Sequence, residues 1–556
     1  MNKINSTIKL LLLSAVLGLT AVSCQDALDI VQSDELNDNI TFNNVADLNN
    51  YLSGAVYSSV NTTSEIKFTS VFTDELGIAP TNTGQDIPLH RFFLDNSDGY
   101  SSGIWQTHYT TINRVNRLLK AAAAITPAAG AETATYNSIL AQARALRAFA
   151  YIQLQSYFTT DMKDDNALGV ILSLEASDDL YQKLPRVKNG DIYNQIDADL
   201  NFAYNNVAVQ NSPTSYYYVS KPMIDALRAR VNLNRGKYAL AKQYAQAAVT
   251  GSGVTLSLGL PRPSSVSNDT PPIITAYPLG STNFNNIFYN EAKNITPYRQ
   301  MFYDRRNTAA ITAPYILNSD NPAFEAFRGE NIWALSRPLT GGWGNIASLY
   351  TTNTSSATGS PLFDMGRNLF NILNANQNDV RRWTFVDPTS KVAPGYATDA
   401  NYVLNDVLII DKYPGKGNQP LRNDIKAIRL SEMYLIMAEA DAYLGNLSSA
   451  ATYVKNVRDA RQMVNTATTL PVYSDLPSAL KDILRERRAE LCFEGHRYVD
   501  LRRSGKAAGV SIDRHFTDDR ISSLPTTLDI NSYKFTLPIP LSEVQGNTTI
   551  VQNPGY

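Results

Sequence analysis

The sequence is poor in the residues that build disulfide frameworks and metal sites. It has two cysteines and four histidines in 556 residues. The histidines are scattered and have no second cysteine beside them, so no zinc-binding spacing is present. They are His90, His108, His496 and His515.

An excess of charge and long apolar runs are also missing. The formal net charge is −2, which excludes a basic protein that binds polyanions. Hydrophobic residues make up 44% of the chain, which excludes a wholly disordered protein. After the first 24 residues no stretch approaches the roughly 18 consecutive apolar residues that indicate a membrane-spanning helix.

Motifs for catalysis are equally scarce. There is no Gly-x-Ser-x-Gly elbow and no phosphate-binding loop, and Gly251-Ser252-Gly253 is interpreted as a turn. Adjacent carboxylates such as Asp74-Glu75 are common and do not by themselves indicate a glycosidase. We therefore expect no catalytic residue, no cofactor and no metal site.

The first 24 residues have the layout of an export signal. Lys3 and Lys9 form a positive region, and Leu10–Val22 is apolar but too short to span a membrane. The segment ends in Ser23-Cys24, which resembles a lipobox, although Ala21 replaces the usual leucine. We expect cleavage before Cys24 and its acylation; the alternative is an ordinary secretory peptide followed by an unrelated cysteine. If Cys24 is acylated, Cys492 has no disulfide partner and is expected to be buried and inert.

Helical periodicity dominates the rest of the chain. Apolar residues recur at helical spacing, and closely spaced alanines in the second stretch below permit tight helix packing. The predicted helical stretches are Ile112–Ala124, Tyr136–Phe158, Ile192–Tyr204, Met223–Val249, Arg429–Leu444, Ser448–Met463 and Leu476–Leu501.

Two of these stretches resemble each other. Ala229–Ala248 and Ala438–Val457 share alanine at the first position, glycine seven residues later and alanine again five residues after that. The pattern resembles a tetratricopeptide repeat, where small residues lie between two helices and glycine lies near their turn. The region between them is different, because residues 251–360 are rich in Gly, Ser, Thr and aromatic residues without a period, which is typical of functional loops.

A sugar ligand needs flat aromatic rings for its apolar faces and polar side chains for its hydroxyl groups. Two segments, Phe72–Trp105 and Tyr277–Tyr350, supply both types of residue. The candidate ligand contacts are Asp74, Arg91, Phe92 and Tyr100 in the first segment, and Tyr289, Tyr298, Tyr303, Arg337, Trp343 and Asn345 in the second. Trp343 lies in a Gly-Gly-Trp-Gly turn, whereas Trp105, Trp333 and Trp383 are expected to be structural.

The segment Ile483–Arg503 is dense in charge. Glu486, Glu490 and Glu494 are four residues apart and are expected to share one helix face. We expect arginines on this helix to form ion pairs along it and to hold neighbouring helices. Ligand binding is expected to use the aromatic loops and not this helix.

Several segments together carry a family resemblance. They are WQTHYTTINRVN at 105–116, IRLSEMYLIMAEADAYLGN at 428–446, NVRDAR at 456–461, ILRERRAELCFEGHRYVDLRRSG at 483–505 and FTLPIPLSEVQGNTTIVQNPGY at 535–556. With the lipobox, these segments make nearly the whole mature chain resemble the SusD family, also called RagB/SusD. Tyr498 departs from the family pattern, which often has tryptophan there, but it keeps the aromatic character.

The resemblance implies a mostly α fold: tetratricopeptide-like helix pairs in one large lobe, with a loop-rich irregular face and little β structure. It divides the chain into a signal peptide (1–23), an N-terminal helical region (24–250), a loop-rich ligand-face region (251–427) and a C-terminal family region (428–556).

The resemblance also implies a function. Such a protein is lipid-anchored on the outer face of the outer membrane, captures glycan and delivers it to a SusC-like TonB-dependent transporter, without cleaving it and without binding nucleic acid. Three alternatives stay open: an oligopeptide-binding member of the same family, an envelope tetratricopeptide scaffold, and an enzyme.

Overall fold

The computed structural model describes most of the chain after residue 41. The described residues are 42–176, 182–209, 215–260, 297–302, 328–337, 346, 350, 361–386, 390–413 and 423–556. Candidate residues Cys24, Tyr289, Tyr303, Trp343 and Asn345 lie outside these ranges, so their predicted roles remain predictions. The division of the chain into four regions likewise remains a prediction.

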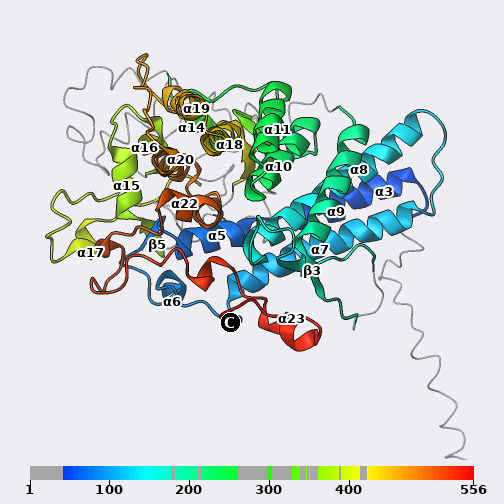
Figure 1. Cartoon of the computed structure of the whole chain (residues 1–556), viewed down its shortest axis with the longest axis horizontal. Coiled ribbons are helices and arrows are strands. Elements are labelled where there is room, and N and C mark those ends of the chain that lie inside the picture. The colour runs from blue at the N-terminus through cyan, green and yellow to red at the C-terminus, as the bar shows by residue number, and fades with distance from the viewer. Residues whose placement is uncertain are drawn as a thin grey trace, which may run out of the picture.

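Long antiparallel helices form one end of the molecule (Figure 1). They are α3 (Val45–Tyr51), α7 (Gly99–Ala122), α8 (Ala131–Phe158) and α9 (Asn189–Asn206), with η1 (Leu52–Val56), α4 (Tyr57–Ser59) and α5 (Thr63–Phe72) leading from α3 towards the middle. The predicted stretches beginning at 112, 136 and 192 are confirmed as parts of α7, α8 and α9. Asp98 begins α7 by accepting hydrogen bonds from the backbone N–H groups of Tyr100 and Ser101.

The two sequence repeats fold as two helix hairpins. The first is α10 (Lys221–Asn234) with α11 (Tyr238–Gly251), and the second is α18 (Leu430–Tyr443) with α19 (Leu447–Ala460). Gly236 and Gly445 lie in the two turns with φ of 73° and 80°, a left-handed conformation that favours glycine. Tyr238 of the first hairpin stacks on Tyr443 of the second, with ring centroids 4.1 Å apart. The tetratricopeptide-like prediction is therefore confirmed at this level.

The last predicted helix is shorter than expected. Helix α20 (Leu476–Leu491) begins with a capping box between Asp475 and Ser478, but it ends before Cys492. Phe493 and Gly495 then have φ of 61° and 86°, which breaks the helix. The chain resumes in α21 (Arg497–Asp500), η6 (Leu501–Gly505) and α22 (Lys506–Ala508). The prediction of one continuous helix to Leu501 was wrong.

The described β structure is small. Three antiparallel pairs form: β1 (Leu76–Ile78) with β5 (Phe363–Met365), β2 (Leu168–Ile171) with β3 (Arg186–Lys188), and β4 (Asn331–Leu335) with β6 (Ile425–Arg429). The remaining short elements are α6 (Ile87–His90), η2 (Ser215–Tyr217), α14 (Pro297–Phe302), α15 (Arg367–Asn374), α16 (Val380–Phe385), α17 (Tyr402–Asn405), η7 (Phe516–Asp518), η8 (Tyr533–Phe535) and α23 (Leu541–Gly546). The fold is mostly helical, as expected.

The interior contains the tryptophans and the cysteine that were expected there. Trp105, Trp333 and Trp383 are all buried, and so is the free thiol of Cys492. Burial raises the pKa of this thiol to about 12, which makes it unreactive at neutral pH. Within the described ranges, the helices are all too short or too polar to cross a membrane.

Candidate functional site

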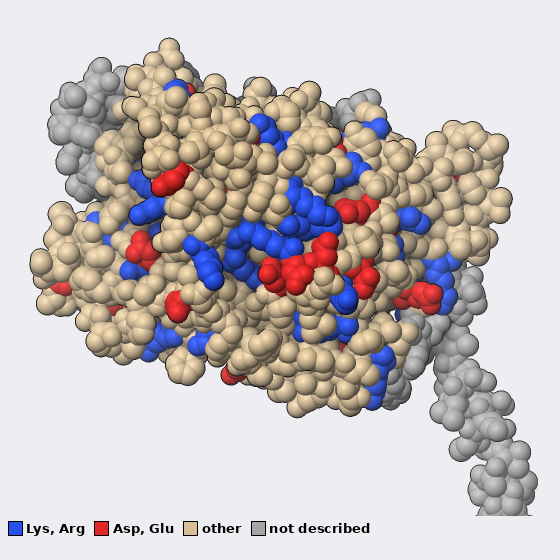
Figure 2. Space-filling model, viewed as in Figure 1, with Lys and Arg blue, Asp and Glu red and all other residues tan. Residues whose placement is uncertain are grey.

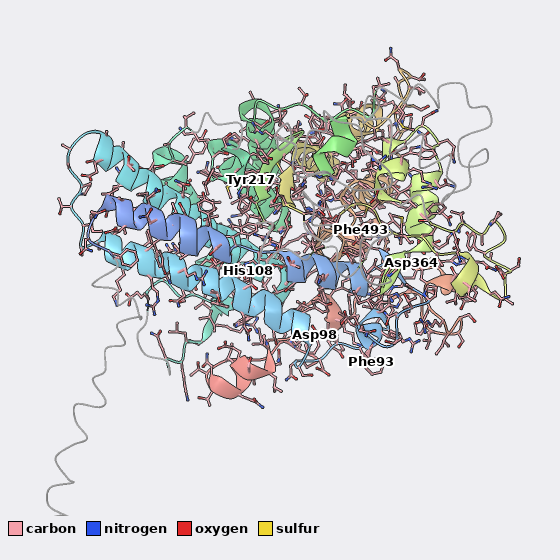
Figure 3. The ribbon with its side chains drawn as sticks, turned by 180° about the vertical axis from the view of Figure 1, so that it is seen from behind. Phe93, Asp98, His108, Tyr217, Asp364 and Phe493 are labelled. Carbon is pink, nitrogen blue, oxygen red and sulfur yellow. The ribbon has the colours of Figure 1, made fainter. Side chains whose placement is uncertain are left out.

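The loop between β1 and α7, here called the Phe93 loop (residues 79–98), presents an aromatic ring to solvent. Phe93 is 76% exposed, whereas the preceding Phe92 is 5% exposed. Phe92 has φ of 64° and Asp86, which precedes α6, has φ of 56°. Left-handed backbone is uncommon for side chains of this size, and such strain concentrates at functional sites. Figure 3 shows Phe93 on the outer side of this loop.

Arginine and lysine side chains from the C-terminal segment hold this loop in place by hydrogen bonds and ion pairs. Arg514 donates to the carbonyls of Val71, Phe72 and Thr73 at 3.1, 2.7 and 2.6 Å, and also to the carbonyl of His90. Its guanidinium lies 4.3 Å from the ring centroid of Phe92. Burial lowers the pKa of Arg514 to about 10, which leaves it charged at neutral pH.

Two further contacts fix the same part of the loop. Lys534 donates to the carbonyl of Phe92 at 2.7 Å, and Arg91 forms a two-fold ion pair with Asp519 at 2.8 and 2.8 Å. Because the backbone immediately before Phe93 is held, the position from which its ring extends is restricted. A rigid exposed ring loses little entropy when a ligand stacks on it.

The same loop also carries polar side chains. Asp86 accepts a hydrogen bond from the hydroxyl of Tyr100 at 2.7 Å. Burial, and then the nearby Asp86 carboxylate, raises the pKa of Tyr100, so the phenol stays a neutral donor. Gln85 and Asp95 are exposed in the same loop. A flat ring beside amide and carboxylate groups suits a ligand with apolar faces and hydroxyl edges.

Two predicted residues of the first aromatic segment, Arg91 and Phe92, lie in this loop, and a third, Tyr100, contacts it from the start of α7. It makes Phe92 part of the interior and Phe93 the exposed ring, which the sequence pattern could not distinguish. No periodic signal separates two adjacent phenylalanines in a loop. The choice follows from the left-handed backbone at Phe92 and the contacts of Arg514 below it.

The remaining described candidates have internal contacts. Asp74 is fully buried and accepts from Arg497 at 2.8 and 2.8 Å. Tyr298 is also fully buried, and its hydroxyl donates to Glu490 at 3.2 Å. These two side chains therefore hold the interior together and do not form a ligand surface. Arg337 is 4% exposed and donates to the Val60 carbonyl at 3.1 Å.

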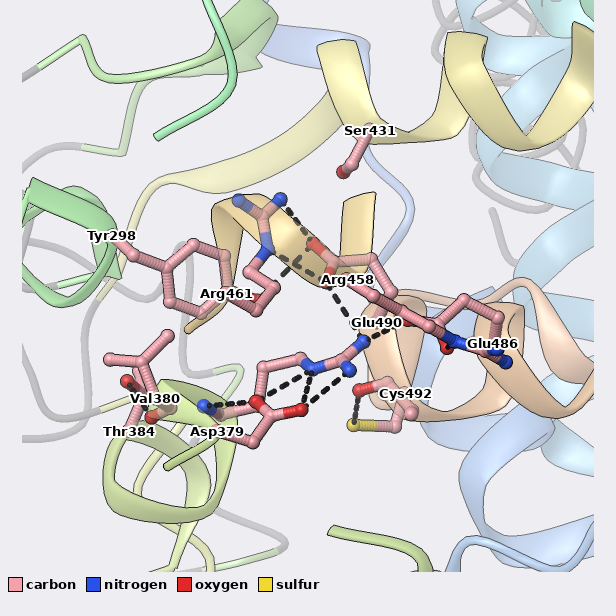
Figure 4. A network of polar contacts seen from close by, with 12 residues as sticks. Tyr298, Asp379, Val380, Thr384, Ser431, Arg458, Arg461, Glu486, Glu490 and Cys492 are labelled. Atoms are coloured by element: carbon pink, nitrogen blue, oxygen red, sulfur yellow. Dashed lines mark hydrogen bonds and ion pairs between the residues drawn. The ribbon is translucent and has the colours of Figure 1, made fainter. Parts of the chain in front are cut away.

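The charged segment forms a buried network centred on Glu490 (Figure 4). Glu490 accepts from Arg429 at 2.7 Å, from Arg461 at 2.9 and 3.0 Å, and from Arg381 at 3.3 Å. Glu330 holds both Arg429 and Arg461 from the other side. Burial would raise the pKa of Glu490, but Arg461 and Arg429 outweigh it and hold this pKa well below its usual range.

This network confirms that the charged residues hold neighbouring elements together, but it corrects the partners. Arg487 pairs with Asp500 at 2.8 Å and Arg497 pairs with Asp74, so neither forms the predicted pair along the helix. Glu494 lies beyond the end of α20 and instead binds Arg429. His496 is partly buried, and desolvation lowers its pKa to about 4. Across the described ranges no group of three potential metal ligands comes together.

The surface seen in Figure 2 has mixed charge. Lys and Arg side chains gather in the middle of this face, and Asp and Glu side chains lie directly among them. The margins of the same face are mostly uncharged. This face therefore offers no large patch of one sign, in agreement with the net charge of −2.

Comparison with known proteins finds similarity to the SusD family. A model described as the SusD family matches residues 361–556. One SusD-like protein of Formosa agariphila is 24% identical over 569 residues, covering 97% of this chain and 98% of the relative. Another from the same organism is 35% identical over 144 residues, which is 25% of this chain and 26% of that relative. Residues 361–556 therefore match the SusD family, and nearly the whole chain is similar to a SusD-like protein.

Solved structures of the SusD superfamily share the fold. A SusD superfamily protein from Bacteroides thetaiotaomicron has a TM-score of 0.66 and 21% identity, covering 92% of this chain and 100% of that chain. A SusD-like carbohydrate binding protein from Bacteroides vulgatus has a TM-score of 0.63 and 17% identity, covering 92% and 98%. At this identity the likeness establishes the arrangement of helices, and the ligand of this chain has to be argued from its own residues.

Proposed function

We propose that this SusD-like protein is a surface-exposed, lipid-anchored glycan-binding protein of the outer membrane. It captures oligosaccharide or polysaccharide, passes it to a SusC-like TonB-dependent transporter, and does not cleave it. The observation that carries the glycan-binding part is Phe93, a 76% exposed ring on a loop whose backbone is held by hydrogen bonds immediately before it. Similarity to the SusD family and the SusD-like carbohydrate binding protein of shared fold support the same ligand class.

The anchor and the transporter rest on different grounds. The lipobox-like ending at Cys24 supports acylation, and similarity to the SusD family supports the transporter partnership. These parts can be tested by co-purification of the transporter from membranes and by protease accessibility on whole cells. A protein that stays protected from protease on intact cells is not surface-exposed, and the proposal would then be wrong in that respect.

Glycan binding is tested by screening a polysaccharide and oligosaccharide array with the wild type and with Phe93→Ala. A ring stacked on a desolvated ligand face contributes on the order of 1–3 kcal/mol, so affinity should fall roughly five- to a hundred-fold. The melting temperature should barely change, because the ring packs little. Val472→Ala is the matched control, since Val472 is a 94% exposed apolar side chain outside the loop.

Two outcomes would contradict the proposal. If the wild type binds no carbohydrate but binds members of a peptide library, the ligand class is wrong. If Phe93→Ala binds normally and melts early, the ring is structural and the Phe93 loop is not the binding site. Product release from a bound glycan, by protein purified from a host without the relevant hydrolases, would contradict the non-catalytic role.

A further inference from the structure

A separate cavity lies where the turn of helix after α3 meets η2 and the end of β4. It has a volume of about 460 Å³, within the range of roughly 300–1,000 Å³ that is typical of small-ligand pockets. Tyr57, Tyr217 and Tyr218 line it, and so do the serines at 53, 58 and 336. We call it the tyrosine cavity. In Figure 3 Tyr217 lies well away from Phe93, so the cavity and the Phe93 loop are different sites.

The aromatic wall of the cavity is rigid. Tyr57 donates its hydroxyl hydrogen to Gln142 at 2.7 Å and accepts from the backbone N–H of Val219 at 2.9 Å. Tyr218 meets the ring of Tyr57 edge-on, with centroids 5.5 Å apart, and is 40% exposed. One ring is therefore fixed by hydrogen bonds, and it packs against a second ring that remains partly exposed.

The polar side chains that line the cavity are hydroxyl groups and the guanidinium of Arg337. Ser53, Ser58 and Ser336 are exposed at its rim. The charge of Arg337 is directed inward, because its guanidinium donates to the Val60 carbonyl at 3.1 Å and to the Asn61 side chain at 3.0 Å. Asp424 accepts from the Arg337 backbone at 2.7 Å and from the Tyr217 hydroxyl at 2.8 Å.

The backbone beside the cavity is also unusual. Ser53 belongs to η1, a π-helical turn over Leu52–Val56 between two α-helical segments. Turns of π-helix are rare in proteins overall, but many of them lie at functional sites. They displace side chains from the regular helical positions. Here the turn contributes Ser53 to the rim, and the following α4 contributes Tyr57 and Ser58.

We infer that the tyrosine cavity is a second carbohydrate site, which accepts one neutral sugar ring against the face of Tyr218 with its hydroxyls on the serine rim. The inference rests on the proposed glycan function but uses none of the Phe93 loop. An open aromatic face fits the C–H face of a sugar, and exposed hydroxyls fit its edges. Because the Arg337 guanidinium already donates to Val60 and Asn61, the hydroxyl groups are left to meet the ligand, and the site favours a neutral ring over an acidic one.

The probes for the test are the methyl glycosides of glucose, galactose, mannose and xylose, measured by saturation-transfer NMR and titration. Tyr218→Ala removes the open ring face, and Ser336→Trp fills the cavity. Each should weaken the glycoside that binds best by about five-fold or more. Val472→Ala, at an exposed apolar side chain outside both sites, is the matched control and should leave glycoside affinity within about two-fold. Thermal melting checks that every variant is folded, and methyl glucuronide should bind more weakly than its neutral counterpart.

The outcomes separate this inference from the proposed function. If glycosides bind equally to the wild type, Tyr218→Ala and Ser336→Trp, the cavity is not the site. If no glycoside binds the wild type while a longer glycan binds through Phe93, the cavity inference is wrong and the proposed function stands. If no carbohydrate of any length binds, both are wrong. Preferred binding of the glucuronide would overturn the neutral ligand class.

Discussion

Replacing Glu490 with alanine tests whether the charged segment is structural. Glu490 is fully buried and lies between three guanidinium groups, those of Arg381, Arg429 and Arg461. Removing the carboxylate leaves these groups in the interior with fewer partners. Breaking a buried ion pair from one side costs about 3–5 kcal/mol, because the remaining charge stays desolvated.

The carboxylates around Glu490 determine where in the range of about 3–5 kcal/mol the loss of stability should fall. Glu330 still pairs with Arg429 and Arg461, and Asp379 still pairs with Arg381 at 2.7 Å. Because no guanidinium loses its last partner, we expect the lower part of the range, about 3 kcal/mol. Glu490→Gln keeps the shape and one acceptor oxygen and should cost less, about 1.5–3 kcal/mol.

The assay is urea unfolding of the mature body at pH 7, with the free energy of unfolding obtained by linear extrapolation. Glu175→Ala, at an exposed glutamate, is the matched control and should change stability by less than about 0.5 kcal/mol. Glycan affinity of the folded Glu490→Ala protein should equal that of the wild type. Normal stability combined with lost affinity would refute this reasoning and place the ligand on α20.

The pH dependence gives an independent check on the same variant. The pKa of Glu490 is lowered in the folded protein, so its contribution to stability is present above its unfolded pKa. That contribution is lost as the pH falls below about 4. The stability difference between the wild type and Glu490→Ala should therefore shrink in acid, and a constant difference would contradict a charged role.

Three further predictions follow from single positions. Burial raises the pKa of Glu75 to about 7, so the contribution of Glu75 to folding stability is fully present below its unfolded pKa of about 4.5 and is lost as the pH rises through 7. In urea unfolding, Glu75→Gln should therefore gain about 3 kcal/mol of stability relative to the wild type between pH 5 and pH 8. Parallel pH profiles of the two proteins would contradict this. Gly236→Ala and Gly445→Ala should each cost about 1–2 kcal/mol, because φ is positive at both, whereas Gly99→Ala should be nearly neutral; equal melting temperatures for all three would refute the shared turn geometry. Cys24→Ala should move the protein from the membrane fraction to the soluble fraction on cell fractionation, and undiminished membrane retention would disprove the lipid anchor.

Patterns within one helix or one hairpin were determined by the sequence itself. The repeated Ala and Gly positions of Ala229–Ala248 and Ala438–Val457 located both hairpins, because helix packing needs small residues at fixed spacing. The burial of Trp105 and Cys492 followed from the apolar helical segments around them. These features depend on neighbours within a few turns of chain, and such neighbours are visible in the order of residues.

Contacts between distant segments were decided only by the tertiary structure. Helix α20 ends because Phe493 adopts a left-handed backbone conformation. A phenylalanine in the sequence gives no indication of this conformation, whereas a glycine would. The partners of Glu490 come from residues far away in the sequence, so helical spacing could not identify them. Likewise, Phe93 is the exposed ring because Arg514, more than 400 residues later, binds the carbonyl of His90 and packs on the ring of Phe92. Long-range contacts of buried charges, and not local periodicity, therefore determined which of these aromatic residues is exposed.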